Sequence, residues 1–105
     1  MAPRPLESRA EFIDRLRQAN ADGPCPEVRV GGHHYTHAVV HRDGVWELRR
    51  LVLEPAKMEA YIAEHGCFMP EHAEMLSAPG PDALLSATSL EKLCADLHKL
   101  RWPLV

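Results

Sequence analysis

Histidines gather between residues 33 and 41, where His33, His34, His37 and His41 lie within nine positions. On a strand, His33, His37 and His41 point to the same side, because side chains alternate between the two faces. Imidazoles are suitable ligands for Zn²⁺, Ni²⁺ or Cu²⁺. Residues four apart on a strand are separated by about 13 Å, so one ion cannot bridge them unless His33 or His34 folds back from the Gly31–Gly32 loop. The alternative is a solvated strand face that uses histidine as a polar residue.

A second group of metal-ligand types lies in the C-terminal half. His65, Cys67 and His72 surround an expected helix end, and Cys94 and His98 are four residues apart on the expected last helix. Side chains at that helical spacing can share a ligand, so the five residues together suggest a Cys/His zinc site. Their spacing matches no standard zinc-finger pattern. The competing interpretation is that Cys94 is a small core residue.

Cys25 stands between two prolines and is a third candidate for chemistry. A Cys-Pro pair can supply a thiolate to haem iron, and a thiolate beside a histidine can act as a nucleophile. The simpler interpretation is an exposed thiol. The sequence contains no G-x-S-x-G elbow, no Walker loop and no G-x-G-x-x-G fingerprint. An enzyme would therefore be a small histidine-dependent catalyst.

A surface for a protein partner is the remaining possibility. Tyr35, Arg49, Arg50 and Trp102 are of the residue types that dominate interface energetics, and we take them as the candidate partner-binding residues. The apolar C-terminus, residues 100–105, must dock either on its own domain or on another chain.

Composition limits the classes of protein to consider. The 105 residues are 46% hydrophobic and 26% charged, which excludes a disordered tail or a fibre. Twelve basic and 15 acidic residues give a charge of -3, which disfavours general nucleic-acid binding and docking on anionic membranes. The sequence has three cysteines without a CxxC pair and no apolar leader after Met1, which predicts a reduced, cytoplasmic protein. It has no long apolar run, so we expect no membrane span.

The first half of the chain predicts one helix followed by strands. Ser8 and Glu11 form a capping-box pattern that begins a helix over residues 9–20. Val-, Thr-, Tyr- and Trp-rich sequence around Asp43-Gly44 predicts a β-hairpin. A two-residue turn would pair His41 with Trp46. A three-residue turn would pair His41 with Val45, and we favour it because it separates polar from apolar side chains more cleanly.

The second half predicts helices around one short extended segment. Pro55 and Gly66 bracket a helix, and a short helix is expected over residues 71–76. Residues 78–82 read as a breaker, and residues 83–87 as a short strand or extended segment. Thr88 with Glu91 suggests a capping box for the last helix, whose apolar face runs from Leu90 to Leu100 and which Pro103 ends.

We therefore expect a single α+β domain over residues 1–105, with residues 1–7 as a loose lead-in. An antiparallel β-hairpin or three-stranded sheet would pack against about three helices. The leading functional hypothesis is a small cytoplasmic protein of bacterial type that binds another protein as an inhibitor, an immunity or antitoxin-like factor or an adaptor. It would have no catalytic activity and no cofactor. The alternatives are a metal- or haem-binding protein and a small histidine-dependent enzyme. A homodimer through an unpaired hairpin edge is also compatible with the sequence.

Overall fold

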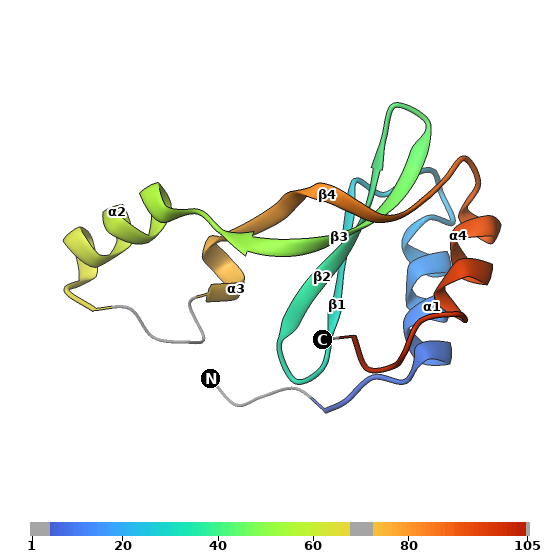
Figure 1. Cartoon of the computed structure of the whole chain (residues 1–105), viewed down its shortest axis with the longest axis horizontal. Coiled ribbons are helices and arrows are strands. Elements are labelled where there is room, and N and C mark those ends of the chain that lie inside the picture. Colours follow the sequence, from blue (N-terminus) through green and yellow to red (C-terminus); the bar gives the residue numbers. More distant parts are fainter. Residues whose placement is uncertain (1–4, 68–72, 105) are drawn as a thin grey trace.

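The computed structural model describes residues 5–67 and 73–104, which form four helices and four strands. In chain order these are α1 (Arg9–Ala19), β1 (Glu27–Gly31), β2 (Tyr35–Arg42), β3 (Val45–Leu53), α2 (Pro55–His65), α3 (Ala73–Leu76), β4 (Ser77–Ala87) and α4 (Leu90–Leu97). The strands make one antiparallel sheet in the order β1-β2-β3-β4 (Figure 1). The expected α+β class is confirmed. The sheet has four strands rather than three, because residues 83–87 are the end of β4.

One face of the sheet carries the hydrophobic core. Helices α1 and α4 lie side by side on this face (Figure 1). The residues that α1 and α4 bury are Phe12, Ile13, Leu16, Leu93, Cys94 and Leu97, and the sheet contributes Val28, Val30, Val39, Leu48 and Ala87. Their apolar side chains recur every three or four residues on the helices and every second residue on β1, which is the pattern that places one face of each element inward.

The two helices of the core begin at side-chain caps. Ser8 and Glu11 form the predicted capping box of α1, and the helix ends one residue earlier than expected, at Ala19. The capping box predicted for Thr88 and Glu91 is wrong. Ser89 is the N-cap of α4, and its hydroxyl accepts a hydrogen bond from the backbone N–H of Lys92. A serine one position later satisfies the same unpaired N–H groups, which a spacing rule alone does not resolve. The helix ends at Leu97, well before Pro103.

The β2–β3 hairpin has a two-residue turn, and the three-residue register that we favoured is wrong. His41 pairs with Trp46 and Arg42 with Val45, so Asp43 and Gly44 alone form the turn. Their φ angles are 53° and 78°, the left-handed values that a type I′ turn requires at both positions. This turn matches the right-handed twist of the strands. That match outweighs the better separation of polar from apolar side chains that the other register would give.

The predicted breaker over residues 78–82 is also wrong, because these residues lie inside β4. Strand β4 is at the edge of the sheet, where a proline without an N–H costs no ladder bond on its open side. The register is irregular: Arg49 pairs with Ala83 and Leu51 with Pro79, which leaves residues 80–82 opposite a single residue of β3. Pro79 and Pro81 therefore produce a bulged edge strand instead of ending the strand.

The long β3–β4 ribbon carries part of the chain away from the core. It extends beyond β1 and β2 and bears α2 and α3 at its far end (Figure 1). We call residues 51–84 the arm. As predicted, α2 begins at Pro55 and Gly66 is its C-cap, with a φ of 80°; the last helical residue is His65. Of the expected helix over residues 71–76, Ala73–Leu76 is helical and residues 71 and 72 lie outside the described residues. The radius of gyration is 14.7 Å, against about 13 Å for a typical domain of this length. The arm accounts for this elongation.

Candidate functional site

The histidines of the first half do not converge on one point. His33 and His34 lie exposed in the turn between β1 and β2, whereas His37 and His41 lie on β2. This turn is tight, because a Cβ on Gly31 would lie 2.4 Å from the carbonyl oxygen of His34. His41 is half-buried and packs on Trp46, its cross-strand neighbour, with ring centroids 4.3 Å apart. The structure thus uses this histidine for packing.

His37 is the one buried polar or charged residue among the residues that the structure describes, with 1% of its surface exposed. Its Nδ1 lies 2.6 Å from the hydroxyl oxygen of Thr36, a hydroxyl–imidazole pair of the kind used in nucleophilic catalysis. Burial, assisted by the nearby positive charge of Arg50, lowers the pKa of His37 below 6.5. With 1% of its surface exposed, this imidazole is closed to a substrate in the structure. The arrangement therefore supports a structural role better than a catalytic one.

The lowered pKa of His37 makes stability depend on pH. The unfolded chain binds a proton at this imidazole more readily than the folded chain does, so stability increases with pH between the lowered pKa and the ordinary value of 6.5. The contribution of neutral His37 is fully present above that range. It is lost progressively as the pH falls through the range.

The second group of metal-ligand residues is divided between two ends of the molecule. His65 and Cys67 are exposed at the end of α2, whereas Cys94 is buried in α4 and His98 is exposed at its C-terminus. Helices α2 and α4 lie at opposite ends of the structure (Figure 1). His72 lies outside the described residues. Burial raises the pKa of the Cys94 thiol, which favours the core role suggested for it.

No group of three or more His, Cys, Asp or Glu side chains in the described parts of the chain is placed to hold a metal ion. Cys25 is half-buried at the edge of the core, where its thiol lies 3.5 Å from the carbonyl oxygen of Glu27. Its backbone N–H donates to the side chain of Asn20, which fixes the loop between α1 and β1. These contacts hold the Cys25 loop against the core.

The four candidate partner-binding residues do not form one patch. Arg49 is only 15% exposed in its side chain; it pairs with Glu47 at 3.0 Å and donates to the carbonyl of Gly80 at 2.8 Å. Its neighbour Arg50 points to the opposite face of the sheet and is exposed. Tyr35 lies at the start of β2, 5.9 Å from the guanidinium of Arg15. Arg49 therefore fastens β4 to the body.

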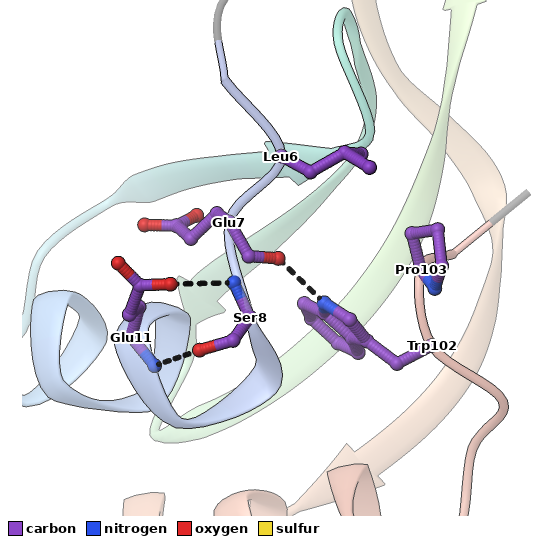
Figure 2. A pocket seen from close by; sticks show the side chains of 6 residues that line it. All are labelled: Leu6, Glu7, Ser8, Glu11, Trp102 and Pro103. Carbon is purple, nitrogen blue, oxygen red and sulfur yellow. Dashed lines mark hydrogen bonds between the residues drawn. The ribbon is translucent and has the colours of Figure 1, made fainter.

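Trp102, the fourth candidate, docks the C-terminal tail on its own domain. Its ring stacks on Phe12 with centroids 5.8 Å apart, and its Nε1–H donates to the carbonyl of Glu7 at 2.8 Å. A hollow of about 260 Å³ lies beside it, lined by Leu6, Glu7, Ser8, Glu11, Trp102 and Pro103 (Figure 2). Polar groups of this lining already bind within the chain: Glu7 pairs with Arg15, and Glu11 accepts from the N–H of Ser8. The terminal hollow is thus the weaker of two candidate binding surfaces.

The arm is the stronger candidate, because apolar side chains that fail to reach the core collect on it. The structure describes five exposed large apolar residues, and four of them belong to the arm. They are Val52 (40% exposed), Ile62 (38%), Met75 (66%) and Leu84 (50%). The fifth is Leu6, at the terminal hollow (54%). Val52 and Leu84 line the same hollow, and exposed apolar groups that lie together are typical of interaction sites.

Helix α2 presents much of this surface. All its residues are described and none is buried; Met58 and Tyr61 are half-buried and Ile62 is exposed. These three residues fall on one face because side chains advance by about 100° per residue. The same geometry places Glu59 beside Ile62 on one flank of the apolar face, and Lys57 followed by Glu64 on the other flank, beside Tyr61. An amphipathic helix without buried residues gains little stability from its own chain and is suited to a partner's groove.

The bulge in β4 makes a second feature of the arm. A hollow of about 160 Å³ forms where residues 80–82 stand opposite Arg50, and it is lined by Arg50, Val52, Gly80, Pro81, Asp82 and Leu84. It opens beside two of the exposed apolar residues, Val52 and Leu84. The arm therefore offers an apolar helix at its tip and an apolar hollow at its base.

Charge is distributed unevenly between the arm and the remainder of the chain. In the sequence, residues 51–84 contain six acidic residues and one basic residue, a formal charge of -5. The other residues contain nine acidic and eleven basic residues, a formal charge of +2. An interpretation based on the total of -3 misses this contrast. The excess of acidic over basic residues in 51–84 and the Met58, Tyr61 and Ile62 pattern are the sequence signals that identify the arm.

Comparison with protein-family models, with curated proteins and with solved structures gave no match. In the described residues no helix is both long enough and apolar enough to cross a membrane.

Proposed function

We propose that this chain is a protein-binding module that acts through its arm. The observation that carries the proposal is the concentration of exposed apolar side chains on residues 51–84, four of the five in the described structure. Exposing apolar surface costs about 25 cal/mol for each Å² that water must cover, so a partner that buries these side chains gains free energy. An inhibitor, an immunity or antitoxin-like factor and an adaptor all work by such binding.

Different parts of the chain stabilise the fold and present the proposed binding surface. The core between α1, α4 and the sheet holds the fold, and Arg49 fastens β4 at the base of the arm through Gly80. The arm itself contributes little to that core. A rigid base with an exposed, amphipathic tip presents binding residues without requiring the core to open.

Paired substitutions test this function. Tagged wild-type chain, Ile62→Asp and Leu6→Asp are each purified from the organism that encodes the protein, and co-purifying proteins are quantified by mass spectrometry. Ile62→Asp places a charge on the arm, whereas Leu6→Asp places the same charge at the terminal hollow and is the matched control. Burying an unpaired charge in an interface costs several kcal/mol, so Ile62→Asp should weaken binding of the purified partner at least about 30-fold.

The same experiment can contradict the proposal. If Leu6→Asp abolishes binding and Ile62→Asp leaves it unchanged, the terminal hollow is the binding surface and the arm is not. Both variants should retain the wild-type circular dichroism spectrum, because neither residue belongs to the buried core.

A further inference from the structure

We infer that the partner of the arm is a protein with an apolar groove bordered by lysine and arginine side chains, into which α2 docks. This inference rests on the proposed function, because it describes the partner of the same surface. It follows from combining the apolar face of α2 with the acidic character of the arm.

The apolar face explains why a groove is required. Met58, Tyr61 and Ile62 occupy the i, i+3 and i+4 positions by which an amphipathic helix enters a hydrophobic groove. Tyr61 is held against His65, with ring centroids 4.3 Å apart, so part of the helix face is already ordered before binding. An ordered side chain loses less conformational entropy on association.

The charge explains why the rim of the groove should be basic. Glu59 borders the apolar face beside Ile62, Glu64 lies next to Lys57 on the Tyr61 side, and both glutamates are exposed. Lys57, the one basic residue of the arm's sequence, pairs with Glu54 at 3.3 Å and so leaves the acidic character of the helix largely intact. The described charged side chains of the arm, Glu54, Glu59, Glu64 and Asp82 against Lys57, have a formal charge of -3, which attracts a basic protein and repels phosphate backbones and anionic lipids.

Charge also disfavours a second copy of the chain as the occupant through arm-to-arm contact. Two arms that meet face to face would bring two segments of formal charge -5 together, and like charges in contact are destabilising. A contact between the arm of one copy and the body of another would join a segment of formal charge -5 to a remainder of formal charge only +2, so the attraction would be weak. A basic partner provides the larger attraction.

Synthetic peptides test the charge preference directly. The probe is a helical peptide of about 15 residues with leucine on one face and lysine elsewhere, and the counter-probe has glutamate in place of lysine. Calorimetry at low and high salt measures affinity, and amide shifts in an NMR spectrum locate the contact. We expect the lysine peptide to bind at least tenfold more tightly than the glutamate peptide, with shifts confined to the arm, and to weaken as salt increases.

Matched charge variants separate a local effect from the overall charge. The double variant Glu59→Gln, Glu64→Gln should lower the affinity for the lysine peptide about fivefold, as expected for the loss of two exposed ion pairs. The control, Asp14→Asn with Asp22→Asn, removes two exposed acidic groups from the body and should change affinity less than twofold. Equal effects of the two double variants, equal affinity for both peptides, or shifts on the body would overturn the inference.

The two proposals can fail separately. A natural partner whose binding depends on Ile62 but which shows no preference for basic residues leaves the function standing and removes the basic groove. If the lysine peptide binds the arm but Ile62→Asp loses no natural protein, the preference for a basic groove stands and the proposed function fails. A purified chain that is dimeric through its arm in sedimentation measurements contradicts the basic partner.

Discussion

Truncating one arm residue and one core residue should have very different effects on stability. Ile62 is 38% exposed, so Ile62→Ala removes three carbon groups that are about three-fifths covered, a loss of about 1.5 kcal/mol at 0.8 kcal/mol per group. The higher helix propensity of alanine returns about 0.4 kcal/mol. The net cost is therefore about 1 kcal/mol. Leu93 is fully buried, and Leu93→Ala should cost about 2–5 kcal/mol because it also leaves a cavity.

Urea unfolding followed by circular dichroism measures both variants, and a thermal scan gives a second value, at about 4–8 °C per kcal/mol for a chain of this size. Each measurement is repeated at two protein concentrations. The account predicts a small cost for Ile62→Ala that does not depend on concentration. A cost equal to that of Leu93→Ala would refute the reasoning, because it would mean that α2 is packed against its own chain. A cost that grows with protein concentration would mean that a second copy covers α2.

Three further predictions concern the core, the tail and the thiols. Wild-type chain should lose stability on acidification from about pH 7.5 to pH 5.5 more steeply than His37→Gln, because the pKa of buried His37 is lowered; parallel urea midpoints for the two proteins would contradict this. Trp102→Phe keeps the stack on Phe12 but loses the hydrogen bond to Glu7, so the free energy of unfolding should fall by about 1 kcal/mol; an unchanged urea midpoint would mean that the tail is not docked. A thiol reagent should modify exposed Cys67 within the native state and Cys94 only on unfolding, since burial raises the pKa of the Cys94 thiol; mass spectrometry of the timed reaction distinguishes the two sites.

Local patterns in the sequence predicted most of the elements. Ser8 with Glu11 and Pro55 with Gly66 each specify a helix end through contacts within a few residues, and these predictions hold. The predicted hairpin register is wrong because turn geometry outweighs the separation of polar from apolar side chains: Asp43 and Gly44 both take positive φ. The breaker over residues 78–82 failed because the cost of a proline depends on whether its strand lies at an edge, which only the assembled sheet determines.

The candidate site was harder to predict, because it depends on which residues the fold leaves outside. Trp102 and Ile62 are both large apolar residues in the sequence, yet Trp102 docks on Phe12 and Ile62 remains exposed. Arg49 and Arg50 are neighbours in the chain and point to opposite faces of the sheet. Burial is decided by packing over long distances in sequence, so residue type alone could not distinguish the anchors of the fold from the binding surface.

The most direct measurement places a photo-crosslinking amino acid at position 62 of the arm and, as a control, at position 95 on the exposed side of α4. Each protein is irradiated in extract of the organism that encodes it, and adducts are identified by mass spectrometry. The account predicts a defined adduct with one other protein from position 62, absent from position 95 and suppressed by excess unlabelled wild-type chain. No adduct from position 62, equal adducts from both positions, or an adduct of two copies of this chain would contradict it.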